Sequence, residues 1–296
     1  MNRREFLTKT SAVVTASVGG VSRLVAQSSV IMPVFTPIRR NVGVFTARGG
    51  TMGWLTSDEA VVVIDSQFAD SARLFLDGLR SRTGRRIDLL LNTHHHPDHT
   101  GGNGVMRPAV TRIVAHEKVP ALQRAQAIEM GAAQAQAYAD ETFATTWKVR
   151  MGDEVVSATH YGPGHTGADA VYRFEQANVV HMGDLMYHQR HPGADRAAGG
   201  SLRHWIGTLE QVVKDHAADT IYIFGHAKDG APVSGNRSDL LVVRDCLSSL
   251  LDIVQKGISG GKSVEEITSD WNVPGFNHLA GEPDFQSAYD ELTANG

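Results

Sequence analysis

The sequence is poor in cysteine, lacks long apolar runs and carries no large excess of one charge. Its 296 residues include one cysteine, Cys246, so no intrachain disulfide can form. Beyond the N-terminal region, no apolar segment is long enough to span a bilayer. The formal net charge of −4 gives no basic surface, which argues against nucleic acid as a substrate. The composition therefore favours one globular enzyme acting on a small molecule. Cys246 lies in an apolar helical pattern and is predicted to be buried.

Histidine, by contrast, is abundant and concentrated. Residues 93–99 read Thr-His-His-His-Pro-Asp-His. Four of these side chains have the spacing His-x-His-x-Asp-His, and they are His94, His96, Asp98 and His99. Imidazole and carboxylate groups bind transition metals, so this one loop can supply half of each of two neighbouring sites. The apolar segment 89–92 precedes the loop and is predicted to be a buried strand, which places the ligands at its C-terminal end, where α/β sheets carry their sites.

Three further ligands are predicted downstream, each directly after a glycine in a turn or at a strand end. They are His165, Asp184 and His226. A glycine at these places lets the backbone come close to a crowded metal centre. An isolated histidine is more often a structural residue, but the ordered set favours metal binding.

This set resembles the metallo-β-lactamase superfamily over roughly residues 35–230, because the loop, a Gly-His-Thr turn, a Gly-Asp strand end and a Gly-His strand end follow in the family's order. The resemblance implies a first metal held by His94, His96 and His165. It implies a second metal held by Asp98, His99 and His226, with Asp184 bridging both. Asp65, at the end of the apolar run 61–65, resembles the family's acidic residue behind the ligands. His95 and His160 lie outside the pattern and are interpreted as neighbours.

The resemblance implies two zinc ions, because histidines dominate the ligand set and no thiolate is present. Iron or manganese stays open, since Asp98 and Asp184 add hard oxygen ligands. In the implied chemistry a metal-bridging hydroxide attacks a carbonyl whose developing charge the first metal stabilises. Asp98 is the candidate catalytic residue, because it can orient the nucleophile. An oxygen-reducing di-iron relative is expected to carry a carboxylate in place of His96, which disfavours redox chemistry.

The region around position 184 leaves the substrate open. The β-lactamases have Cys or Ser where this chain has Asp184, and a lysine where it has Tyr187, whereas a bridging Asp is typical of glyoxalase II-like thioesterases, lactonases and esterases. We predict a dinuclear hydrolase of an ester, thioester, lactone or lactam bond. The alternatives are a β-lactamase acting on antibiotics and a non-catalytic metal-binding accessory protein of an exported redox system. Four residues that follow can hold a substrate anion or form a solvated loop: Tyr187, Arg190, His191 and Arg196.

The N-terminus resembles a twin-arginine export signal. Residues 2–9 read Asn-Arg-Arg-Glu-Phe-Leu-Thr-Lys, and a mildly apolar stretch over 11–21 follows that is too short for a permanent membrane anchor. Small residues near 26–29 indicate a cleavage zone, so residues 1–27 are predicted to be a signal peptide. The twin-arginine export machinery would then be a partner, and the folded protein would be periplasmic or secreted. Removing this segment takes away four basic residues and one acidic residue, which lowers the net charge from −4 to about −7.

The remaining pattern predicts two halves rich in strands. Strands are expected near 31–36, 41–46, 51–56 and 60–65, and again near 148–160, 170–175 and 178–183. Helices are expected near 69–82, 118–140, 201–216 and 238–255, and a capping box at 263–266 opens another. The predicted fold is an α/β protein, an αββα sandwich of two mixed sheets with outer helices and the site at the sheet edge. Residues 28–296 form one domain in this prediction, with a C-terminal helical extension from about 236.

Overall fold

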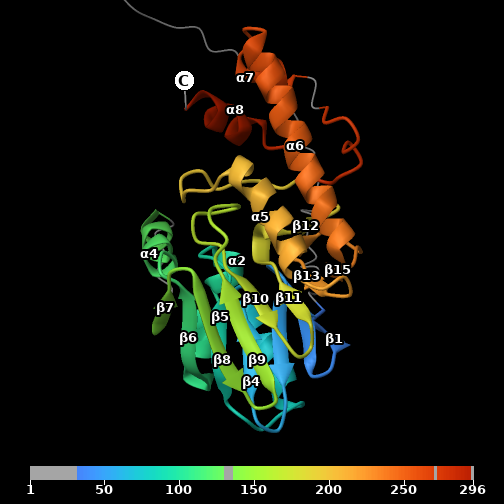
Figure 1. The fold of residues 1–296 in the computed structure, drawn as a ribbon. Coiled ribbons are helices and arrows are strands. Elements are labelled where there is room, and N and C mark those ends of the chain that lie inside the picture. The colour runs from blue at the N-terminus through green and yellow to red at the C-terminus, as the bar shows by residue number, and fades with distance from the viewer. Residues whose placement is uncertain (1–31, 130–135, 270–271, 295–296) are drawn as a thin grey trace, which may run out of the picture. The chain divides into compact units, whose positions relative to one another are not determined.

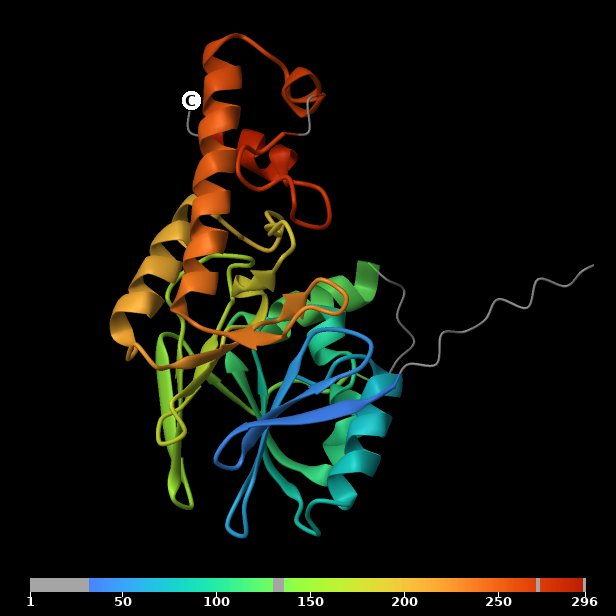
Figure 2. The same ribbon diagram turned by 90° about the vertical axis from the view of Figure 1, so that its right-hand side faces the viewer.

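Two β-sheets pack face to face in the computed structural model, and helices cover the outer face of each sheet (Figure 1 and, turned by 90°, Figure 2). The structure describes residues 32–129, 136–269 and 272–294. The prediction of a signal peptide over 1–27 lies outside the described residues. The predicted αββα sandwich is confirmed.

The first sheet has seven strands in sequence order, and its second half is parallel. Strands β1 to β4 pair antiparallel, whereas β4 to β7 pair parallel, so their C-terminal ends share one edge. The connection from β4 to β5 is helix α1 (Ala69–Arg80). The strands are β1 (Val34–Arg39), β2 (Val42–Thr46), β3 (Met52–Thr56), β4 (Val61–Ile64), β5 (Ile87–Asn92), β6 (Val110–His116) and β7 (Glu141–Phe143).

The second sheet has six strands in the order β15-β13-β11-β10-β9-β8. Only β11 and β13 are parallel, and helix α5 (Leu202–Asp215) lies between them in the chain. A separate two-stranded ladder pairs β12 (Tyr187–His188) with β14 (His226–Ala227). The six strands are β8 (Thr146–Met151), β9 (Glu154–Thr159), β10 (Val171–Phe174), β11 (Val179–His181), β13 (Ile221–Ile223) and β15 (Ser234–Gly235).

Strand alternation explains why both faces of each sheet are covered. Successive side chains point to opposite faces, so an apolar run such as β4 supplies two cores at once. Val62 and Ile64 face the second sheet, where they join Tyr172 of β10 in the central core. Val61 and its alternate neighbours pack instead against α1, through residues such as Phe75. This run is therefore apolar throughout because neither of its faces meets water.

The C-terminal extension is helical and begins with α6 (Arg237–Ser259), followed by α7 (Val264–Thr268) and α8 (Phe285–Thr293). Asn236 and Ser263 each close a capping box, so the predicted capping box at 263–266 is confirmed. Helices α5 and α6 cover the second sheet, and Cys246 of α6 is buried as predicted. Among the described helices, none has both the length and the apolarity to cross a membrane.

Two predicted elements are corrected. The segment 148–160 is a hairpin of β8 and β9, because Gly152 adopts a φ of 64° and reverses the chain. The helix predicted over 118–140 is α4 (Val119–Glu129). Residues 136–140 are not helical: Asp140 instead binds the backbone of Ile113 at the edge of β6. Short elements complete the fold, namely α2 (Pro97–Thr100), α3 (Asn103–Met106), η1 (Arg107–Ala109) and η2 (Gly183–Leu185).

Candidate metal centre

All seven predicted ligands come together at one edge of the sandwich. The loop after β5 and the short helix α2 carry the first four. His165 lies in the loop between β9 and β10, Asp184 on η2 directly after β11, and His226 on β14 after β13. Strand ends from both sheets meet here, which explains how one site collects residues 132 positions apart in the chain.

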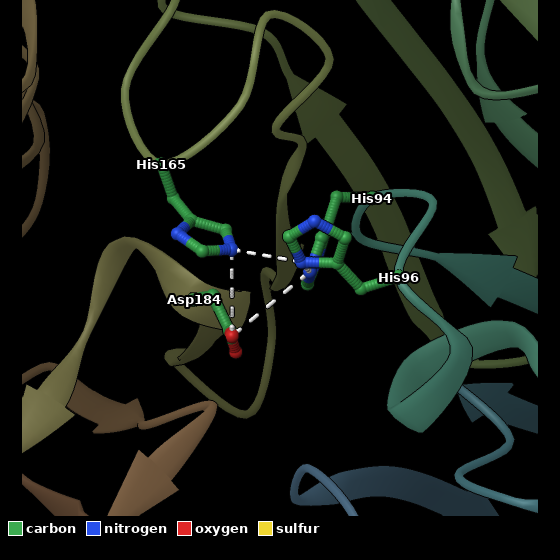
Figure 3. Close-up of side chains that lie close together, drawn as sticks. All are labelled: His94, His96, His165 and Asp184. Carbon is green, nitrogen blue, oxygen red and sulfur yellow. Dashed lines mark hydrogen bonds and ion pairs between the residues drawn. The ribbon is translucent and has the colours of Figure 1, made fainter. Parts of the chain in front are cut away.

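The first group consists of His94, His96, His165 and Asp184 (Figure 3). His96 Nδ1 lies 3.1 Å from His94 Nε2 and 3.0 Å from His165 Nε2. Asp184 Oδ2 is 3.9 Å from His94 Nε2 and 3.7 Å from His165 Nε2. Three ring nitrogens and one carboxylate oxygen thus face a common point.

The ring nitrogens that face away from this point are each held by the protein. His94 Nδ1 lies 3.0 Å from Thr93 Oγ1, and His165 Nδ1 donates to the carbonyl of Gly193 at 2.6 Å. His96 Nε2 lies 2.9 Å from Asp195 Oδ2. When an imidazole donates its outer N–H in this way, the lone pair of the other nitrogen faces inward and can bind a metal.

The second group consists of Asp98, His99 and His226. His226 Nε2 lies 3.0 Å from Asp98 Oδ2 and 3.5 Å from His99 Nε2. The outer nitrogen of His99, Nδ1, is 2.7 Å from Asp65 Oδ2. Asp65 is therefore behind a ligand, as the resemblance implied.

Asp184 joins the two groups. Its Oδ1 lies 2.9 Å from His99 Nε2, and its Oδ2 lies 3.3 Å from His226 Nε2. The same carboxylate faces the nitrogens of the first group at 3.7 and 3.9 Å. One buried carboxylate therefore serves both sets of ligands.

The charges of the two groups differ. Burial lowers the pKa of His94 well below its usual value and that of His165 to about 4, so these two imidazoles of the first group are neutral. Burial also disfavours charge on His99, but Asp184 and Asp65 outweigh it and raise its pKa well above the usual range. For His226, Asp184 and Asp98 overcome burial and raise the pKa to about 9. The carboxylates around His99 and His226 therefore favour a positive charge at the second group, and either a proton or a metal cation can supply it.

The residues present fit two zinc ions. Bonds of 2.0–2.1 Å to a tetrahedral zinc place its ligand atoms roughly 3.3 Å apart, which matches the spacing within each group. Asp184 Oδ1 is buried and accepts no hydrogen bond among the described residues, although an imidazole nitrogen is 2.9 Å away. A buried carboxylate oxygen without a donor is costly unless a cation compensates it.

Two glycines make this close approach of backbone and ligands feasible. Gly183 has a φ of 52°, and a side chain there would meet Thr93 Cβ at 2.7 Å. A Cβ on Gly225 would collide with Asp184 Oδ1 and with the backbone of Gly183. Both glycines directly precede a ligand, as the sequence pattern indicated.

The four predicted substrate residues have different surroundings. The Tyr187 hydroxyl donates to Asp184 Oδ2 at 2.7 Å, and its ring stacks on His226 with centroids 5.5 Å apart. Arg190 lines a cavity of about 400 Å³ that also borders His226. His191 lies 3.7 Å from the sulfur of Cys246 and faces α6. The Arg196 guanidinium is 3.2 Å from Glu291, so its charge is already compensated, which does not support a substrate role.

Sequence reasoning missed the outer partners of the first group. Asp195 and Gly193 lie in an irregular loop far along the chain from His96, and nothing in their local pattern distinguishes them. The contact between Tyr187 and Asp184 was also missed, although the two residues are only three positions apart and this closeness in the chain could have suggested it. His95 lies near Asp195, with Nε2 at 3.7 Å from Oδ2, whereas His160 stacks on His116 with centroids 4.0 Å apart.

Comparison with known proteins identifies the family to which this sequence is similar. A family model described as the metallo-beta-lactamase superfamily matches residues 45–226. The chain is 25% identical over 185 residues to a hydroxyacylglutathione hydrolase from Synechococcus sp. strain JA-3-3Ab, a match that covers 60% of this chain and 65% of that protein, slightly under two thirds of its length.

Solved structures show the same likeness of fold. A metallo-beta-lactamase from Pontibacter korlensis superposes with a TM-score of 0.61 at 20% identity, covering 73% of this chain and 99% of that chain. A double mutant of the sec-alkyl sulfatase PisA1 gives 0.68 at 15% identity, covering 88% of this chain and 50% of that chain.

Proposed function

The chain belongs to the metallo-beta-lactamase superfamily, and from this we propose that it is an exported dinuclear zinc hydrolase that cleaves an ester, thioester, lactone or lactam bond. The observation that carries the proposal is the position of Asp184, whose carboxylate oxygens lie 2.9–3.9 Å from ring nitrogens of both ligand groups. A shared carboxylate between two such groups is the arrangement of a dinuclear site.

Zinc, when bound, supplies Lewis-acid polarisation and activates water as a nucleophile. The chain's own residues determine where the substrate arrives. Among the seven ligands, the side chains of Asp98, His226 and His96 are exposed by 25%, 20% and 18%, whereas the others are nearly inaccessible. Substrate therefore approaches on the Asp98 side, and Asp98 can orient the attacking water there.

Tyr187 holds the shared carboxylate in place. Burial and then the charge of Asp184 raise the pKa of Tyr187 well above its usual value, so its hydroxyl stays protonated and donates. The ring also stacks against His226 at an interplanar angle of 18°. This residue therefore orients the shared carboxylate of Asp184 and the ring of His226 at once.

The cavity beside His226 fits an anionic part of the substrate. Arg190 and Lys228 line it together with small residues and backbone, and Asp229 partly offsets their charge. Within the described part of the chain, neither Arg190 nor Lys228 forms an ion pair, so both are available to pair directly with a substrate carboxylate.

Three considerations support a thioester or related acyl substrate over a lactam. The bridging position is Asp184, position 187 lacks the lysine expected of a β-lactamase, and one similar protein is a hydroxyacylglutathione hydrolase. A β-lactam is the alternative substrate, because it is encountered outside the cytoplasm.

Export through the twin-arginine machinery completes the proposal. The proposed export rests on Arg3, Arg4 and the apolar stretch that follows them, because a receptor recognises such a signal and the machinery then carries folded proteins across the membrane. A protein that acquires its metals before crossing the membrane suits this route.

Metal analysis combined with a hydrolysis panel tests the proposed activity. Purified mature protein should contain about two zinc ions per chain, by the ligand count. It should hydrolyse at least one member of a panel of thioesters, lactones, aryl esters and chromogenic lactams. Chelation should abolish turnover and zinc should restore it. Two bound metals with no hydrolysis of any class would favour the non-catalytic accessory role, and one metal or none after zinc loading would refute the dinuclear site.

A further inference from the structure

The loop over residues 189–200 lies between the metal centre and the C-terminal extension. On its inner side the Gly193 carbonyl accepts a hydrogen bond from His165 Nδ1 at 2.6 Å, and Asp195 Oδ2 lies 2.9 Å from His96 Nε2. Two of the three imidazoles of the first ligand group therefore owe their orientation to this one loop. The loop contains only an isolated bridge at Arg190, and its later part is fixed by turns and by the loop that carries His165. The Gly200 N–H donates to the Asp195 carbonyl at 2.8 Å, and the Asp195 N–H donates to the His165 carbonyl at 2.7 Å.

On its outer side the same loop is held by α8 and the segment before it. The Ala194 N–H donates to Asp284 Oδ2 at 2.9 Å, and the Ser287 hydroxyl donates to the Ala194 carbonyl at 3.2 Å. Ala194 lies between the two residues that contact the ligands. Earlier in the loop, the His191 N–H donates to the Ala280 carbonyl at 2.9 Å.

Glu291 of α8 fixes the end of the loop. It is 5% exposed, and its carboxylate accepts the Ser201 hydroxyl at 2.6 Å and the Leu202 N–H at 2.7 Å, at the start of α5. Arg196, within the loop, lies 3.2 Å from the same carboxylate. Figures 1 and 2 both place α8 directly beside this part of the chain. The extension therefore contacts the loop at residues 189–191, 194 and 196, and holds the start of α5 behind it.

We propose that α8 is a positioning element of the first metal group: Asp284 and Ser287 hold Ala194, so that Gly193 and Asp195 hold His165 and His96 with the correct nitrogens inward. This proposal depends on the proposed function in one respect, namely that a metal binds to the first ligand group. Helix α8 lies outside residues 45–226, the part that the family model matches. The physical basis is entropy, because residues 193–195 sample more conformations once Asp284 and Ser287 no longer hold Ala194, and the two acceptors then orient the imidazoles less strictly.

Substitutions on α8 separate positioning from general stabilisation. Asp284→Ala removes the acceptor of the Ala194 N–H, and Ser287→Ala removes the second contact without touching the helix cap. Gln286→Ala is the matched control, because Gln286 is exposed on the same helix and, among the described residues, its side chain bonds only to Asp290. Asp195→Ala and Asp195→Asn test the inner contact, since the amide oxygen of Asn can still accept from His96.

Zinc affinity is measured by competition with a chromophoric chelator, and loop order by hydrogen exchange in the metal-free protein. Asp195→Ala should weaken binding of the first zinc by about 10- to 100-fold, with Asp195→Asn between it and the wild type. Asp284→Ala and Ser287→Ala should speed exchange at Gly199 and Gly200 and weaken zinc binding by up to about tenfold. Gln286→Ala should match the wild type in both measurements.

Faster exchange with unchanged zinc affinity in both α8 variants would overturn the proposal, because α8 would then order the loop without positioning the ligands. Imidazole ¹⁵N shifts of the metal-free protein provide a readout that does not need zinc. They should show His165 protonated on Nδ1 and His96 on Nε2 in the wild type, and mixed tautomers in Asp284→Ala. A wild type that binds no zinc would refute the proposed function alone, while unchanged tautomers in Asp284→Ala would still refute the positioning role.

Discussion

Replacing Asp184 by Asn tests the dinuclear assignment most directly. The substitution keeps the size of the side chain but removes its charge and turns one oxygen into an NH₂ group. That group would face imidazole nitrogens, since Oδ1 lies 2.9 Å from His99 Nε2 and Oδ2 lies 3.3 Å from His226 Nε2. The second metal should be lost first, because its other ligands include only two imidazoles, whereas the first metal keeps three.

The size of the effect follows from the distances. A unit carboxylate attracts a unit positive charge about 4 Å away by about 4 kcal/mol when the effective dielectric constant is about 20. Even if solvent and neighbouring dipoles replace a third of this attraction, about 2.7 kcal/mol is lost, which corresponds to about a hundredfold weaker binding. Turnover at subsaturating zinc should fall by at least about the same factor. Asp184→Ala should be no milder, because it also removes the remaining oxygen ligand.

The assay counts metals per chain after dialysis and measures turnover on whichever substrate the panel identifies. His95→Ala is the control in the same loop. His95 is buried beside the ligands, but it belongs neither to the first ligand group nor to the second. It should retain both metals, although loss of a buried ring lowers the free energy of unfolding by about 1–3 kcal/mol. Two tightly bound metals and near-normal turnover in Asp184→Asn would refute the reasoning, as would a His95→Ala variant that loses metal as readily as His94→Ala.

Three further predictions concern export, substrate binding and ligand orientation. Exchanging Arg3 and Arg4 for Lys should leave the protein in the cytoplasm, as fractionation would show; unchanged recovery outside it would contradict the receptor-read signal. Arg190→Ala should raise KM about tenfold for anionic substrates with kcat maintained, because only uniform binding is lost, and an equal rise for a neutral ester would argue against an anion site. Tyr187→Phe keeps the ring on His226 but removes the hydroxyl that donates to the bridging carboxylate, so chelator competition should show the second metal bound about tenfold more weakly. An affinity equal to that of the wild type would show that Tyr187 does not orient the ligands.

The sequence determined the ligand types, their order and the edge of the fold where they meet. These features are local: a histidine-rich loop after an apolar strand, and a glycine directly before Asp184 and His226, indicate sites at strand ends wherever the sheets later pack. The two-core architecture was also predictable, because a strand such as 61–64 that is apolar on both faces must be covered on both. The length of α4 and the hairpin at Gly152 were not, since element boundaries depend on backbone partners such as Asp140 that the pattern does not reveal.

Only the tertiary structure decided how the ligands are oriented. Each imidazole has two nitrogens, and the one that faces the metal depends on what the other one binds. For His96 that partner is Asp195, which is 99 residues away in the chain. The loop carrying Asp195 is in turn held by Asp284, the N-cap of α8, which lies 90 residues beyond Ala194. Such contacts leave no periodicity or spacing in the sequence, because packing alone brings the segments together.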